Sequence, residues 1–265
     1  HKFGGDYHRT IMLNWYYLDA NSNTLEFVYK HVGSSRRQDL FTSKAKDTLF
    51  SANWDLTVVP STGSVVTGLA GAPTAISYSF EFRLNNSETG SLPIVDNAVS
   101  MSTPFIKISD GQVWNVMLQR MTASAAGVGA ATAATSVGSM TNEYRLHAAL
   151  QEGKTIKKYQ YVTMEVSGGL SADSNHRANQ NFVGTGSRLT AFPQNLHVGG
   201  QLPSLPPDGS YFFGLSGSIG EIRGWSTALS ASKFRQHTLN KFSTVGNSLN
   251  SHKDELIYHY KLNEN

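Results

Sequence analysis

The stretch ISYSFEFRL, residues 76–84, decides the fold class, because apolar and polar side chains alternate through it without a break. A period of two residues is that of a β-strand with one buried face and one face toward solvent. Phe80, Phe82 and Leu84 are therefore predicted to point into a core. We expect the polar positions between them, Glu81 and Arg83, to face outward.

Similar stretches recur along the chain, bounded by residues that favour turns. The turns Asp110-Gly111 and Glu152-Gly153 each separate two such stretches and predict β-hairpins. Only residues 230–240 have a helical pattern, with Ser230 as a capping residue. The other predicted strands are residues 11–18, 25–31, 54–59, 106–108, 114–118, 144–150, 158–166, 196–200, 218–225 and 256–262.

The composition of the 265 residues excludes several classes of protein. Charged residues make up 15%, beside 24 Gly, 13 Phe and 11 Tyr, which is typical of short strands joined by polar turns. With no cysteine there is no disulfide, thiolate metal site or cysteine nucleophile. The net charge is +3 and basic residues occur singly or in pairs, so no nucleic-acid partner is expected. No apolar run approaches the ~20 residues that span a membrane.

The order of motifs in the second half resembles the laminin-G-like and concanavalin-A-like domains. The closing part carries LHVGG at 196–200, GSIGEIRGW at 217–225 and ALS at 228–230. Upstream, residues 78–84 are similar to one strand of these families, except at Arg83 and Leu84. Two other segments of these families are similar to residues 105–116 and 256–264. The resemblance covers residues 76–265. It implies an all-β, antiparallel two-sheet jelly-roll β-sandwich with one short helix, and allows calcium at a sheet edge.

The Gly-, Ser- and Thr-rich residues 61–73 indicate a possible boundary. Residues 73–265 would form the laminin-G/concanavalin-A-like jelly roll. Residues 1–72 would supply N-terminal strands, either as a separate appendage or as part of the same sandwich. The residues predicted to fill the space between the sheets are Phe80, Phe82, Leu84, Val116, Leu118, Ile219, Ile222 and Trp225.

The sequence contains no paired carboxylates of the kind used by glucanases with this sandwich, which need two acids flanking one bond. Glu81, Glu165 and Glu221 each stand alone on a predicted strand, and we expect them to be exposed, solvated carboxylates. A relaxed phosphate-loop pattern at residues 148–155 lacks its first glycine and is better explained by a hairpin turn. The chain is therefore predicted to be non-enzymatic, with no catalytic residue.

Metal ligands are not assigned by the sequence. Asp19, Asn21 and Asn23 have the spacing of a calcium loop, but Thr24 stands where that loop needs glycine, so an Asx-rich turn is favoured. A calcium site built from other groups stays open. The nine histidines include no zinc-binding pair, and we expect His197 and His259 to be hydrogen-bonded structural residues.

Two functions are compatible with these observations. The first is a structural or adhesive domain of a larger extracellular or virion protein, such as a phage tail protein, assembled with other copies or other structural proteins. Three observations suggest it: the sequence begins with His1 rather than Met, its last residues do not form an obvious domain boundary, and it contains no cysteine. The alternative is a carbohydrate-binding module that recognises a glycan or a protein surface. Its candidate loops are residues 86–99, 173–187 and 201–211, and residues 122–139 form a further Ala- and Gly-rich loop.

Overall fold

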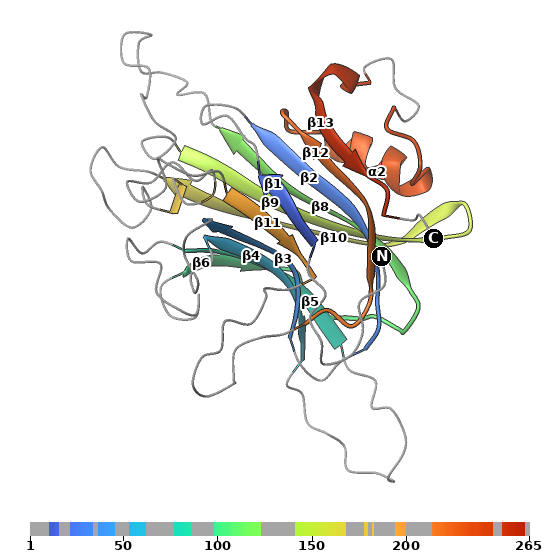
Figure 1. The fold of residues 1–265 in the computed structure, drawn as a ribbon. Coiled ribbons are helices and arrows are strands. Elements are labelled where there is room, and N and C mark those ends of the chain that lie inside the picture. The colour runs from blue at the N-terminus through green and yellow to red at the C-terminus, as the bar shows by residue number, and fades with distance from the viewer. Residues whose placement is uncertain are drawn as a thin grey trace, which may run out of the picture.

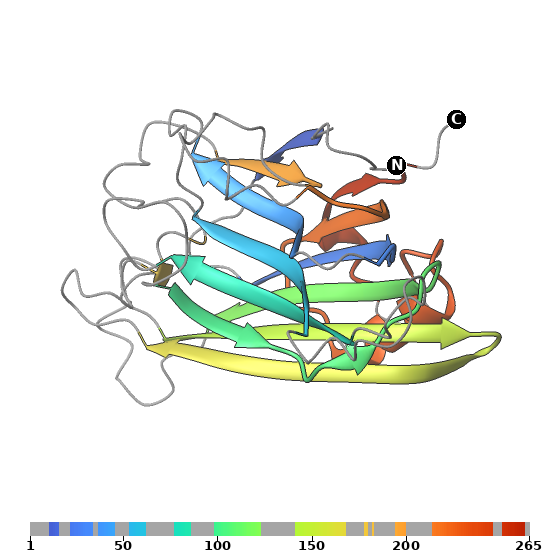
Figure 2. The ribbon, with the colours of Figure 1, turned by 90° about the horizontal axis from the view of Figure 1, so that it is seen from below.

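The computed structural model describes residues 11–15, 22–33, 37–45, 53–61, 77–85, 98–122, 141–167, 178–179, 182, 194–199, 214–245 and 251–262. These residues form two antiparallel sheets stacked face to face, with helix α2 on the outside of one of them (Figures 1 and 2). The predicted all-β jelly-roll sandwich with a short helix is confirmed. None of the helices in the described ranges is long and apolar enough to cross a membrane.

The seven-stranded sheet has the order β1-β11-β3-β4-β5-β6, and the short strand β7 also pairs with β5. The stretch that indicated the fold class lies in β5, between β4 and β6. The strand bounds are β1 Ile11–Trp15, β3 Gln38–Ala45, β4 Trp54–Pro60, β5 Ser77–Asn85, β6 Ala98–Ser102, β7 Ile106–Lys107 and β11 Gln194–Val198.

The six-stranded sheet has the order β10-β9-β8-β2-β12-β13. The predicted hairpin at Glu152-Gly153 is confirmed as the turn of the long β9–β10 pair, which runs along one side of the molecule (Figure 2). The strand bounds are β2 Asn23–Lys30, β8 Val113–Thr122, β9 Thr141–Glu152, β10 Thr155–Ser167, β12 Ser218–Trp225 and β13 Leu256–Tyr260. A 3-10 turn, η2 Lys253–Glu255, precedes β13. Strands β1 to β4, which lie within residues 1–72, pair with later strands in both sheets.

The core between the sheets consists largely of aromatic and branched side chains. Phe82 of β5 and Tyr144 of β9 stack across it, with ring centroids 5.6 Å apart. Burying one such ring stabilises the fold by roughly 1.5–3 kcal/mol. Seven of the eight predicted core residues belong to this cluster: Phe80, Phe82, Leu84, Val116, Leu118, Ile219 and Ile222.

Trp225, the eighth, is buried on the opposite face of the six-stranded sheet, so its prediction was wrong in position. The register between β12 and β2 shifts between Gly220 and Arg223. A bulge of this kind inserts a residue and reverses the alternation that follows it. Ile219 and Ile222 therefore both point inward, although they are three residues apart, and Trp225 points outward.

Helix α2, Ala231–Leu239, follows the predicted range closely. Ser230 caps its first turn by accepting a hydrogen bond from Lys233 N at 3.1 Å. An N-cap of this type contributes ~1 kcal/mol. The helix lies against β9 and β10 on the outer face of the six-stranded sheet, the face turned away from the other sheet (Figure 1).

Candidate functional site

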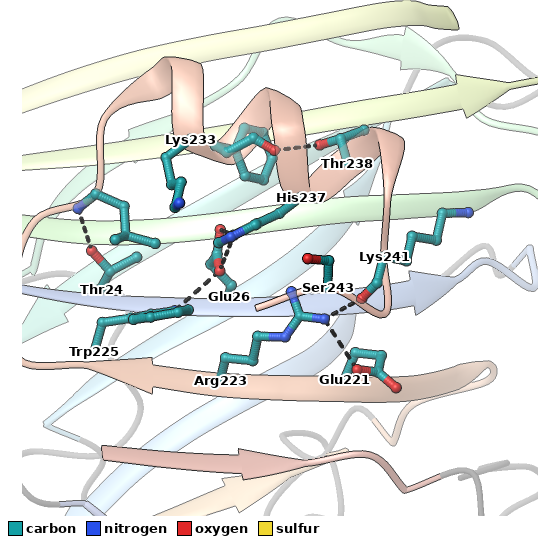
Figure 3. A network of polar contacts seen from close by, with 12 residues as sticks. Thr24, Glu26, Glu221, Arg223, Trp225, Lys233, His237, Thr238, Lys241 and Ser243 are labelled. Carbon is teal, nitrogen blue, oxygen red and sulfur yellow. Dashed lines mark hydrogen bonds and ion pairs between the residues drawn. The ribbon is translucent and has the colours of Figure 1, made fainter. Parts of the chain in front are cut away.

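A buried polar network fastens the α2 region to this outer face (Figure 3). Glu26 of β2 accepts hydrogen bonds from Trp225 Nε1 at 3.1 Å and from His237 Nδ1 at 2.9 Å. Because a carboxylate only accepts, the proton of the second bond belongs to Nδ1 of His237. The Trp225 and His237 rings also stack, with centroids 5.7 Å apart. The pair joins strand β2 to a helix near the other end of the chain.

A second branch of the network runs through Glu221, which is 6% exposed. Its carboxylate accepts from Arg223 Nη2 at 3.1 Å and from His259 Nε2 at 2.7 Å, and Arg223 also donates to the carbonyl of Lys241. The expectation that Glu221 is an exposed carboxylate was therefore wrong. It sits at the bulge with φ 51°, where the backbone turns its side chain toward these two partners. His259 is hydrogen-bonded, as predicted.

The helix in turn completes a row of rings on the sheet. Phe234 lies 5.6 Å from the ring of His147 on β9, and the guanidinium of Arg235 lies 4.7 Å above the ring of Tyr159 on β10. The hydroxyl of Tyr159 is 2.7 Å from Nδ1 of His147. Burial, followed by the charges of two arginines, lowers the pKa of His147 to about 4. His147 is therefore neutral at physiological pH.

Beyond this row the sheet face is open, and we call its residues the Tyr161 surface: Glu143, Arg145, Tyr161, Thr163 and Glu165. Tyr161 is 46% exposed, and its ring centroid lies 4.6 Å from that of His147, the residue directly opposite it on β9. Arg145 Nε and Nη2 each lie 2.9 Å from an oxygen of Glu143. Across the β9–β10 pair, Thr163 is opposite Arg145 and Glu165 is opposite Glu143. The surface therefore combines an exposed apolar ring with several hydrogen-bonding groups on rigid strands.

A second candidate lies on the outer face of the seven-stranded sheet, and we call it the carboxylate–arginine cluster: Arg37, Asp39, Asp55, Glu81 and Arg83. Asp55 binds both arginines, at 3.0 Å from Arg37 Nη2 and 2.6 Å from Arg83 Nη2. Arg37 also lies 3.8 Å from Asp39 and 4.0 Å from Glu81. Glu81 is thus ion-paired, contrary to the expectation of an isolated carboxylate.

Asp39 is the group in this cluster whose protonation is unusual. Burial, and then the neighbouring charge of Asp55, raise the pKa of Asp39 to about 7, against the opposing effect of the arginines. A carboxyl group that holds its proton near neutral pH can act as an acid or a base. Structural ion-pair networks perturb pKa values in the same way, so this feature alone assigns no reaction.

The candidate sites predicted from the sequence lie mainly outside the described residues. Of the three candidate loops only residues 98–99, 178–179 and 182 are described, and of residues 122–139 only Thr122 is. Asp19 and Asn21 are also outside, while Asn23 begins β2. His197 is buried in β11. Within the described ranges, no group of three or more His, Asp or Glu residues could hold a metal ion.

The Tyr161 surface was missed in the sequence. Its signal is the pair Tyr159 and Tyr161, which are separated by Gln160 in β10 and therefore place two aromatic rings on one face. Such a pattern predicts an aromatic sheet face. It does not tell which ring the helix covers.

The chain matches no protein-family model, and no curated protein matches it. Among solved structures, it is similar to the enzymatically active domain of tailspike protein 2 of bacteriophage CBA120, with TM-score 0.53 and 10% identity over 98% of this chain. It spans only 29% of that tailspike chain. A SAP-like pentraxin from Limulus polyphemus matches with TM-score 0.45 and 12% identity, over 93% of this chain and 81% of that one. The CBM40 domain of the Ruminococcus gnavus IT-sialidase, bound to α2,3-sialyllactose, matches with TM-score 0.41 and 13% identity, over 83% and 84%.

The similarity to the tailspike domain concerns the fold alone, and the two stacked antiparallel sheets agree with the jelly-roll sandwich that the sequence resemblance implied. The same similarity corrects one prediction. The chain was expected to be non-enzymatic, but the same fold occurs in a tailspike domain described as enzymatically active. The absence of a glucanase motif is therefore no ground for excluding catalysis.

Proposed function

We propose that this chain is a carbohydrate-binding domain of a larger extracellular or virion protein, and that the Tyr161 surface is its binding site. The observation that carries the proposal is the exposed Tyr161 ring, held on a rigid sheet beside the paired side chains of Arg145 and Glu143. Sugar rings have an apolar C–H face and a rim of hydroxyl groups. They therefore fit a surface that offers one aromatic ring and several hydrogen-bonding groups.

The surroundings of Tyr161 keep it ready to bind. Its strand, β10, is paired with β9 along its whole length, and the Tyr161 ring contacts the ring of His147, the residue opposite it on β9. His147 is in turn held by Tyr159 and by Phe234 of α2. Little ordering of the surface would be needed on binding, which lowers the entropic cost of association.

The similarity to the tailspike protein supports the proposal that this domain belongs to a larger protein, because the matched region is one part of a much longer chain. A carbohydrate-binding domain of a tail or adhesion protein would meet glycans on a cell surface. The laminin-G-like assignment, and an extracellular or virion location, remain part of the proposal.

The test compares glycan binding by the wild-type protein, Tyr161→Ala and the control Tyr260→Ala. Tyr260 is 40% exposed but lies on β13, at the opposite edge of the sheet from β10. A sugar that covers roughly 50 Å² of the Tyr161 ring gains about 1.3 kcal/mol at about 25 cal/mol per Å². We expect close to a tenfold loss of affinity in Tyr161→Ala and none in Tyr260→Ala. A glycan array without any binder would refute the proposal, as would equal losses in both variants.

Assembly with other copies, or with other structural proteins, is a second part of the proposal. Strand β10 is the outermost strand of its sheet, and no strand among the described residues pairs with its free edge. An unpaired edge of 13 residues can accept a strand from another chain. Light scattering over a wide range of concentrations tests this. A strictly monomeric protein would argue against assembly through identical copies.

A further inference from the structure

The charges that surround Tyr161 balance one another. Glu143 and Glu165 are negative, and Arg145 and Arg235 are positive. The two N–H groups of Arg145 nearest to Glu143 form a bidentate pair with it, both at 2.9 Å. The bonds to Glu143 raise the pKa of Arg145 above its ordinary value. Arg145 therefore stays charged, but its charge is already neutralised by a neighbour.

The carboxylates are concentrated at one end of the surface. Glu165 is directly opposite Glu143 in the β9–β10 register, which brings their Cβ atoms to about 5 Å. Ser167 is 3.5 Å from Glu165, but no basic side chain in the described residues is ion-paired with Glu165. A third carboxylate brought to this end by a ligand would meet two negative charges and no free cation. Like charges placed together in this way disfavour the complex.

Uncharged hydroxyl groups, in contrast, can form hydrogen bonds at this end of the surface. Arg145 has about five N–H donors and uses two on Glu143, while a carboxylate has about four acceptor positions. The pair thus retains both donors and acceptors. The planar fork of each group matches two adjacent hydroxyls of a sugar ring, which both donate and accept.

We infer that the Tyr161 surface selects uncharged hexopyranose units over sugars that carry a carboxylate, such as uronic acids, an inference that rests on the carbohydrate-binding function proposed above. The ring of the sugar stacks on Tyr161, and its adjacent hydroxyls bind the Glu143–Arg145 pair. Glu143 is the residue that sets this selectivity, because it neutralises Arg145.

The experiment measures affinities for two oligosaccharides that differ only at C6, namely β-1,4-linked glucan and β-1,4-linked glucuronan oligomers of equal length. Calorimetric titrations are made with the wild-type protein and with Glu143→Gln, which keeps the side-chain shape but frees the charge of Arg145. The control Glu152→Gln removes the same charge at the exposed β9–β10 turn. We expect the wild-type protein to bind a neutral oligomer at least tenfold more tightly than its carboxylate counterpart. Glu143→Gln should reduce that ratio by at least tenfold, and Glu152→Gln should leave it unchanged.

Three outcomes would overturn the inference. If the wild-type protein prefers the carboxylate oligomers, the inferred selectivity is wrong, although the proposed carbohydrate binding still holds. A neutral preference that persists in Glu143→Gln shows that other residues set the selectivity. Binding to neither set, together with an array without binders, removes the proposed function itself. The variant Arg145→Gln supplies a second measurement if Glu143→Gln folds poorly, and it should weaken neutral binding without creating carboxylate binding.

Discussion

Replacing Asp39 with asparagine should stabilise the protein above neutral pH, and the size of the effect follows from the carboxylate–arginine cluster. Desolvation, and then the neighbouring charge of Asp55, raise the pKa of Asp39 from its usual 3.8 to about 7, although 17% of its side chain is exposed. The folded protein therefore keeps a proton that the unfolded chain releases, so stability falls as pH rises from about 4 to about 7. At 1.36 kcal/mol per pKa unit, this shift sets an upper limit of about 4 kcal/mol on the stability lost above pH 7. Asparagine cannot ionise, so Asp39→Asn should escape this loss.

The assay is urea unfolding of the wild-type protein and Asp39→Asn at pH 5, 6, 7 and 8. We expect the variant's advantage in free energy of unfolding to grow across this range by a few kcal/mol, toward the limit of about 4 kcal/mol. Asp254→Asn, at an exposed position of η2, is the matched control and should show a difference that does not change with pH. If Asp39→Asn differs from wild type by the same amount at pH 5 and pH 8, the carboxyl of Asp39 ionises normally and the reasoning is refuted.

The remaining predictions concern the outer face of the six-stranded sheet. Glu26→Ala removes the acceptor of two buried donors, Trp225 and His237. It should destabilise the protein by about 3–5 kcal/mol, measured by urea or thermal unfolding. A loss of stability below about 1 kcal/mol would contradict the structural role of this network. Because the pKa of His147 is lowered to about 4, its NMR titration should be flat from pH 6 to pH 8. Glycan affinity at the Tyr161 surface should be equally flat, and a titration of His147 near pH 6.5 would disprove this.

The strand pattern could be predicted because it depends on neighbours in sequence. The alternation in β5 correctly assigned Phe80 and Phe82 to the core, and Ser230 correctly marked the start of α2. The same rule failed at β12, because a bulge after Gly220 changes which side chains share a face of the sheet. No residue pattern in this segment predicted the bulge. The helical pattern predicted the end of α2 to within one residue, but it did not predict which strands the helix contacts.

The polar sites could not be predicted, because their members meet only through the register of distant strands. Glu26 and His237 are 211 positions apart, and a single sequence offers no reason to pair them. The same holds for Asp39 and Asp55, which lie on adjacent strands whose register itself contains a bulge. The sequence shows Tyr161 as an aromatic residue, but its exposure depends on which part of the sheet face α2 covers.

The position of β2 has a consequence for how this chain reaches its native state. Strand β2 lies between β8 and β12, so the middle of the six-stranded sheet joins an early segment to one near the end of the chain. During synthesis, β2 can pair with β8 well before β12 exists, and one edge of it must then wait uncovered. Contacts this distant in sequence make folding slow and expose a pairing edge meanwhile. A chain shortened before β12 would lose both β12 and β13 and would leave β2, an inner strand of the complete sheet, as an uncovered edge strand.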